Sequence, residues 1–186
     1  GAMPEENTYP LNWIENARIE DGTLVEIRPI RSEDAPRLQE AFKLLSPQSI
    51  YMRFLEVFFE MSDQQAAYFA SVDYTERMAL IATIQQEGKE QIVGVARYDQ
   101  TDQEKPGRAE CAVIVRDDYQ GLGLGKRLMR RLIEYAQEHG VKRLIGTVLM
   151  GNNRMLSFIR ESGLPYEREL LEPGVWQVIV DISRDI

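Results

Sequence analysis

The sequence of 186 residues contains one cysteine, Cys111, and one histidine, His139. A single cysteine excludes a disulfide within this chain and is typical of a reducing compartment, so we expect a cytoplasmic protein. The His, Cys, Asp and Glu residues show no spacing typical of metal ligands, so we expect no metal. No apolar run reaches the roughly 18 residues that a membrane-spanning helix needs. The chain opens with Gly-Ala-Met, which is typical of a cloning scar, and we expect no signal peptide.

The chain also has no excess of basic residues. The chain has 22 Lys and Arg against 30 Asp and Glu, a formal net charge of −8. This charge disfavours nucleic acid and anionic membranes as the main partners. Residues 108–160, however, hold ten Lys/Arg and five Asp/Glu, a net charge of +5, which leaves −13 for the remainder. The basic segment suits a small polyanion and the acidic remainder suits a cationic partner, with charge scattered only for solubility as the alternative.

Apolar periodicity predicts a mixed sheet flanked by helices. Residues 1–22 are polar with scattered aromatics and indicate either an arm or the end of a linker from a larger parent protein. Ser32 is expected to cap the first helix and Ser62 or Asp63 the third. The expected strands are 24–30, 78–86, 91–98, 108–115, 143–149, 166–171 and 175–181. The expected helices are 32–45, 46–59, 62–71, one that follows residues 120–125 and ends near Gly140, and 152–162.

The segment Gln120-Gly-Leu-Gly-Leu-Gly125 lies between an apolar strand and an amphipathic helix. Its glycines allow backbone conformations, and a close approach by a ligand, that side chains would prevent. The unpaired amides and the dipole of the following helix favour an anion, most often a phosphate. Lys126 and Arg127 indicate a multiply charged anion. The glycine spacing differs from that of a P-loop or a dinucleotide-binding turn. A plain tight turn before a surface helix is the alternative.

This segment resembles the Q/R-x-x-G-x-G/A signature of the GNAT acetyltransferases, in which the turn holds the pyrophosphate of acetyl-CoA. The resemblance extends from about Leu24 to the C-terminus, and residues 152–163 are similar to the family's second cofactor-contacting helix. Three segments resemble the catalytic domains of bacterial protein lysine acetyltransferases, the Pat-like branch: Asp21-Gly-Thr23, Ile27-Arg-Pro-Ile30 and Ser49-Ile-Tyr-Met-Arg-Phe54.

The resemblance implies an α/β (α+β) GNAT fold. Its mixed, mostly antiparallel central sheet has about six to seven strands, is flanked by helices and is splayed between strands four and five. We expect this acetyltransferase domain at 23–186, after an N-terminal arm or linker at 1–22. The parallel pairing of strands 108–115 and 143–149 follows from the usual crossover of the helix between them.

The resemblance also implies a function. An acyltransferase of this family transfers acetyl from acetyl-CoA directly to an amine, with no metal, nucleic acid or membrane involved. The implied acceptor is a protein lysine, for example on acetyl-CoA synthetase. A small amine (a polyamine, an aminoglycoside or an amino acid) is the alternative acceptor. A non-catalytic CoA-binding sensor is the alternative from a different class.

Glu110 is the candidate general base. It is the only ionisable side chain apart from Cys111 between Ala109 and Val115, on a strand otherwise suited to the core. Burial would disfavour its charged form, which suits a base that must take up a proton. The resemblance agrees, because related lysine acetyltransferases carry a catalytic glutamate at this place. A solvent-facing glutamate is the alternative, and Cys111 is expected to be a small core residue rather than a nucleophile.

The resemblance assigns the cofactor contacts to the end of one strand, the turn and two helix starts. Asn152 could equally be a helix cap. Many family members have a general-acid tyrosine where this chain has Ile159, and the nearest hydroxyl, Ser157, is expected on another face, so we assign no general acid. The cofactor-binding candidates are Val113, Ile114, Val115, Gln120, Gly121, Leu122, Gly123, Leu124, Gly125, Lys126, Asn152 and Arg154.

Overall fold

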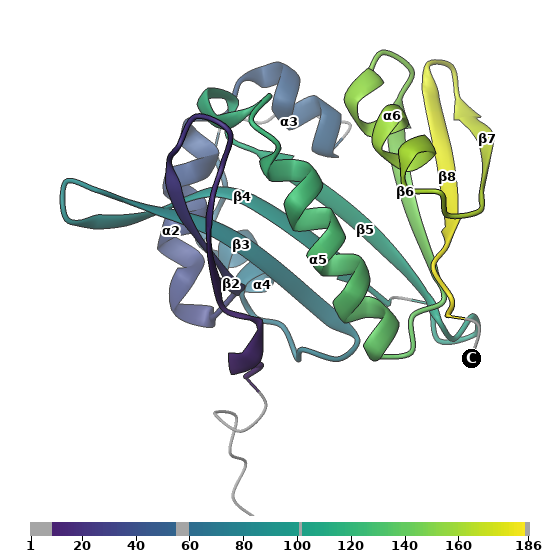
Figure 1. Ribbon diagram of the computed structural model, residues 1–186, viewed down its shortest axis with the longest axis horizontal. Helices are drawn as coiled ribbons and strands as arrows, with labels where there is room; N and C mark the ends of the chain where they lie inside the picture. The colour runs from purple at the N-terminus through teal and green to yellow at the C-terminus, as the bar shows by residue number, and fades with distance from the viewer. Residues whose placement is uncertain (1–8, 55–59, 101, 185–186) are drawn as a thin grey trace, which may run out of the picture.

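The computed structural model describes residues 9–54, 60–100 and 102–184, which form an eight-stranded sheet with helices on both faces (Figure 1). The strand order is β1-β2-β3-β4-β5-β6-β8-β7, and every neighbouring pair is antiparallel except β5 and β6. This confirms the mixed, mostly antiparallel sheet. The strands are β1 Glu15–Arg18, β2 Leu24–Pro29, β3 Arg77–Gln86, β4 Lys89–Asp99, β5 Arg108–Val115, β6 Arg143–Leu149, β7 Tyr166–Glu172 and β8 Val175–Asp181.

The helices divide between the two faces of the sheet. Helix α5 (Leu124–Glu138) covers one face, whereas α2 (Ala35–Lys43) and α4 (Asp63–Ala70) pack on the other (Figure 1). Helix α3 (Pro47–Phe54) lies near β5, and α6 (Asn153–Glu161) packs on β6 and β8. Short 3-10 turns occupy Leu11–Trp13, Ser32–Asp34 and Asp117–Tyr119. Among the described residues, no helix has the length and apolar character needed to cross a membrane.

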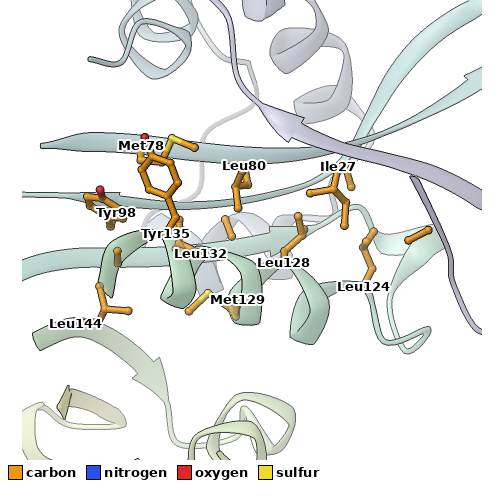
Figure 2. Close-up of a cluster of buried hydrophobic side chains, with 14 of the residues drawn as sticks. Ile27, Met78, Leu80, Tyr98, Leu124, Leu128, Met129, Leu132, Tyr135 and Leu144 are labelled. Atoms are coloured by element: carbon orange, nitrogen blue, oxygen red, sulfur yellow. The ribbon is translucent and has the colours of Figure 1, made fainter. Parts of the chain in front are cut away.

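Helix α5 is anchored by one apolar stripe. Leu124, Leu128 and Leu132 are at most 1% exposed and face sheet residues such as Ile27 and Leu80 (Figure 2). Each fully buried leucine contributes roughly 1.5–3 kcal/mol relative to an exposed one. The stripe therefore fixes the N-terminus of α5, and with it the glycine-rich turn, against the sheet.

Two details differ from the sequence prediction. Residues 15–18, expected to belong to an arm or linker, form β1 and pair with β2, which makes the sheet one strand wider. Ser32 is not the cap of the first helix: its hydroxyl donates to Glu33 at 3.1 Å, and the Asp34 carboxylate accepts the Arg31 amide at 2.7 Å instead. Ser62 caps α4 by accepting the Gln65 amide, as one of the two caps expected for that helix.

Residues 55–59, expected to end the second helix, lie outside the described residues.

A buried charge network joins β2 to the start of α2. Arg28 donates to both carboxylate oxygens of Asp34, at 2.9 and 2.7 Å, and to Glu90 of β4 at 2.6 Å. Asp34 is 1% exposed and Arg28 is 5% exposed. Removing Asp34 would leave the buried Arg28 with only the more exposed carboxylates of Glu90 and Glu26, which is costly.

We expect Asp34→Ala to lower the free energy of unfolding by about 3–5 kcal/mol, because Arg28 would lose its buried bidentate partner. Urea denaturation measures this loss. Glu40→Ala is the matched control, since Glu40 pairs with Lys43 on an exposed helix face, and its effect should stay within about 0.5 kcal/mol.

The effect of Asp34→Ala should depend on pH. Burial alone would raise the pKa of Asp34, but hydrogen bonds from Arg28 and the Arg31 amide outweigh it and hold the pKa below its ordinary value. The carboxylate therefore contributes its stability above the pKa of the unfolded chain and loses it as the pH falls through the folded pKa. A stability difference between wild type and variant that stays constant on acidification would contradict this account.

Candidate active site

The site begins where β5 and β6 separate. Their parallel register covers only Arg108↔Arg143 to Glu110↔Ile145, although β6 stays paired with β8 as far as Leu149. From Cys111 onward, β5 therefore pairs with no described strand on the β6 side. The two strands diverge toward α3 and α6 (Figure 1). This is the splay expected between the fourth and fifth predicted strands, and a cleft of about 910 Å³ opens along it.

The glycine-rich turn forms one end of the cleft. Gly121 and Gly123 have φ values of +79° and +83°, the left-handed region that favours glycine, and Gly123 immediately precedes α5. Among the described residues, the backbone amides of 121–126 have no hydrogen-bond acceptor. Unpaired amides at a helix N-terminus attract an anion, so the turn fits a phosphate group as the sequence predicts.

Two cations stand beside this turn. A Cβ atom at Gly121 would lie 3.3 Å from Nη2 of Arg154, which places that guanidinium against the turn. Lys126 lines the cleft and makes only a weak, exposed ion pair with Glu161, at 3.8 Å. Both side chains can therefore turn to a bound phosphate at little cost.

Gln120 connects the turn to α3. Its side-chain amide donates to the Val115 carbonyl at 2.9 Å and to the Ser49 hydroxyl at 3.1 Å. Asp117 accepts from the Ser46 amide at 2.9 Å and from the Ser49 hydroxyl at 3.1 Å. Burial opposes ionisation of Asp117, but these hydrogen bonds outweigh it and hold its pKa below the ordinary value. The side chain of Gln120 thus braces the turn against the start of α3.

Most of the predicted cofactor residues meet at this cleft. The exception is Leu122, which packs on the main core while its carbonyl accepts the Glu20 amide at 3.3 Å. Asn152 caps α6 by accepting the Met155 amide at 3.1 Å, the alternative role considered for it, and it also lines the cleft. The predicted residues that line the cleft are Val113, Ile114, Val115, Gln120, Gly121, Gly123, Leu124, Gly125, Lys126, Asn152 and Arg154.

Glu110 lines the cleft at the last paired position of the β5–β6 ladder. Its side chain is exposed, so the expectation of a desolvated carboxylate was wrong. Alternation on β5 places it on the face opposite the α5 core, and the splay leaves that face open. A solvated carboxylate at this position can still accept a proton from an amine, directly or through water.

Other groups near Glu110 are less suited to proton transfer or nucleophilic attack. Asp99, its neighbour on β4, is held by Arg77 at 2.7 Å and Arg97 at 3.3 Å. Burial raises the pKa of the Cys111 thiol to about 12, so the thiol is protonated at neutral pH. Within the described part of the chain, no group of three or more His, Cys, Asp or Glu side chains could hold a metal ion.

The position that holds a general-acid tyrosine in many family members is occupied by an apolar side chain in this structure. Ile159 is 8% exposed and lines the cleft, whereas Ser157 is not among the cleft residues, as expected from its place on α6. The structure therefore supplies no replacement acid from this helix.

Among the cleft residues that sequence reasoning did not assign to the site are two arginines, Arg53 of α3 and Arg97 of β4. The signal for Arg97 was available, because it is a lone charge in the apolar run Ile92–Tyr98, the same pattern that singled out Glu110. The signal for Arg53 was weaker, since an arginine on a short helix is ordinary.

Comparisons with known proteins agree with this geometry. The sequence profile of the acetyltransferase (GNAT) family matches residues 40–164. An acetyltransferase of Pseudomonas aeruginosa is 35% identical over 158 residues, which cover 85% of this chain and 83% of that protein. Acetyltransferase Pat of Mycolicibacterium smegmatis is 30% identical over 165 residues, which cover 89% of this chain but 48% of Pat, so the chain spans about half of its length.

A solved structure extends the comparison. The crystal structure of the GNAT domain of S. lividans PAT superposes with a TM-score of 0.81 at 29% sequence identity, covering 93% of this chain and 99% of that domain. The similarity thus extends over nearly the whole chain.

We expect Gly121→Ala to weaken acetyl-CoA binding roughly 10–100-fold, the effect of losing one charge-assisted contact. The new methyl group would lie 3.3 Å from Nη2 of Arg154 and push the guanidinium away by a few tenths of an ångström. Calorimetry measures the affinity. Gly140→Ala is the matched control, because Gly140 has a similar φ of +80° with no atom within 4 Å of an added Cβ. Equal losses of affinity in both variants would attribute the effect to backbone strain instead.

Proposed function

Because the chain belongs to the acetyltransferase (GNAT) family and is therefore an acetyl-CoA-dependent acetyltransferase, we propose that its acceptor is a lysine side chain of a protein. One observation carries the proposal. Residues 49–54, which resemble the protein-modifying branch of the family, lie on α3, and Ser49, Met52 and Arg53 from this segment line the same cleft as Glu110. Similarity to the Pat proteins over most of the chain supports it.

The donor half of the site fits acetyl-CoA, which supplies the thioester. The unpaired amides of residues 121–126 would bind its pyrophosphate, with Lys126 and Arg154 adding positive charge. The open edge of β5 at residues 113–115 would hydrogen-bond the pantetheine arm as an added strand would, and a backbone amide there would polarise the thioester carbonyl.

The part of the site that binds the acceptor must present a neutral amine to the thioester. A lysine ammonium has no lone pair, and its ordinary pKa of about 10.4 leaves little free amine at pH 7. Glu110 would accept the proton, directly or through one water molecule. Direct transfer is favoured over an acyl-enzyme route because the Cys111 thiol, whose pKa is raised by burial, is a poor nucleophile at neutral pH.

We expect Glu110→Gln to slow turnover about 10²–10⁴-fold at pH 7, the usual effect of losing a general base. The loss should shrink at high pH, where free amine forms without help. Steady-state kinetics across pH test both points, with calorimetry to confirm unchanged acetyl-CoA affinity. Glu104→Gln, on an exposed turn outside the cleft, controls for the change of charge. Activity of Glu110→Gln near that of the wild type at pH 7 would remove Glu110 from the mechanism.

The acidic remainder of the chain supports docking on a basic patch around a target lysine. Such steering acts through the association rate and is screened by salt. We expect transfer to a protein acceptor to fall as salt rises from about 50 to 300 mM, mainly through the apparent KM. Acetyl-CoA affinity is measured at each salt concentration, so that a loss of donor binding is not mistaken for a loss of docking.

The alternatives are separated by a side-by-side assay. Acetyl-CoA synthetase is compared with a panel of polyamines, aminoglycosides and amino acids, and new acetyl-lysines are mapped by mass spectrometry. Efficient turnover of a small amine with no lysine acetylated on the protein would refute the lysine proposal. Binding of CoA with no free thiol released in the presence of any amine would instead indicate a non-catalytic sensor.

A further inference from the structure

Arg97 lines the cleft and has one buried donor without a partner among the described residues. Its side chain on β4 is only 5% exposed, and its Nη2 atom is buried with no hydrogen-bond partner among the described residues. The other nitrogens are engaged, because Nη1 donates to the Phe69 carbonyl at 3.0 Å and Nε to Asp99 at 3.3 Å. A buried donor without an acceptor costs free energy, so a site that retains one is suited to an acceptor that arrives with a ligand.

Arg53 places a second cation on the wall of the same cleft. It lines the cleft from α3, stacks over the Phe54 ring at 4.4 Å, and makes no ion pair with a described carboxylate. Burial, and then the nearby charge of Arg97, lower the pKa of Arg53 to about 10, so the guanidinium stays charged at neutral pH. Two arginine side chains on the wall of one cleft favour a bound anion there.

The carboxylates nearby do not neutralise this pair. The two oxygens of Asp99 already contact Arg77 and Arg97, at 2.7 and 3.3 Å. Glu110 is the neighbour of Asp99 across the β4–β5 ladder. In the proposed mechanism, Glu110 accepts the proton of the acceptor amine. Three guanidinium groups, those of Arg53, Arg77 and Arg97, thus face two carboxylates.

The position of this pair separates it from the cofactor's phosphates. Arg97 contacts α4, on the face of the sheet opposite α5, whereas the glycine-rich turn begins α5. An anion bound at Arg53 and Arg97 would therefore lie on the acceptor side of the splay, beside Glu110.

We propose that Arg53 and Arg97 form a subsite for a carboxylate carried by the acceptor, positioned so that the acceptor amine reaches Glu110. The guanidinium fork matches a planar carboxylate in shape and charge. The proposal rests on the proposed function: on a protein acceptor the carboxylate belongs to an Asp or Glu beside the target lysine. On a free amino acid the same chemistry would come from the α-carboxylate.

The test uses pairs of lysine peptides that differ only by Asp or Asn at each flanking position. We expect the wild-type enzyme to prefer one Asp peptide about 10–100-fold in kcat/KM, the worth of a charge-assisted hydrogen bond. Arg53→Gln should remove most of this preference, and Arg53→Lys should retain part of it. Lys43→Gln is the matched control, since it removes a cation from α2 outside the cleft. Arg97→Lys is a second variant, read only if its thermal stability and acetyl-CoA affinity match the wild type.

A second pair of probes identifies the source of the carboxylate. Nα-acetyl-lysine carries a free α-carboxylate and Nα-acetyl-lysinamide does not. If no lysine peptide is acetylated but the carboxylate form of this small pair is preferred through Arg53, the subsite stands and the protein-lysine proposal fails. If peptides are acetylated with no Asp preference at any position, the subsite is refuted and the proposed function stands.

The donor must also be varied. Succinyl-CoA carries its carboxylate on the acyl group, so it competes for the same guanidinium groups if they face the donor. A wild-type preference for succinyl-CoA over acetyl-CoA that disappears in Arg53→Gln would overturn the assignment to the acceptor. Equal loss of activity with Asp and Asn peptides in Arg53→Gln would also contradict it, because a purely structural arginine has that effect.

Discussion

The early end of the β5–β6 ladder is the constraint on which the candidate site depends. Along the opening, each strand is paired on its other side, residues 110–115 of β5 with β4 and β6 with β8, so the opening lies between two fixed edges rather than in a loop. Hydrogen-bonding groups on such edges are already oriented before a ligand arrives. Preorganisation of this kind lowers the cost of binding an extended chain and of polarising a carbonyl.

Much of the fold could be predicted from the sequence because its elements carry strong local patterns. The predicted limits of β5, β6 and β8 match the structure, since these strands are apolar runs bounded by polar turns. The strand at residues 15–18 could not be predicted, because only Ala17 is buried and its neighbours are charged or polar. Its pairing with β2 depends on tertiary contacts and leaves no alternation of apolar and polar residues in the sequence.

The candidate site was predicted less evenly. The glycine-rich turn was predictable, because positive φ at Gly121 and Gly123 demands glycine in the sequence itself. The environment of a charged side chain in an apolar strand could not be predicted. Alternation along a strand tells which face of the sheet a side chain lies on, but not whether another element covers that face. Glu110 faces the open splay and is exposed, whereas Arg97 on the adjacent strand is buried beneath α4.

The hydrogen bonds that join Gln120 to Ser49, and Ser49 to Asp117, have a thermodynamic consequence. They connect the glycine-rich turn, the proposed site of the donor's pyrophosphate, to α3, which lines the proposed acceptor side of the cleft. Linkage requires that any change in acceptor affinity caused by the donor through this connection be matched by an equal change in donor affinity caused by the acceptor. In the proposed mechanism, such a coupling between donor and acceptor binding would pass through the hydrogen bonds of Ser49.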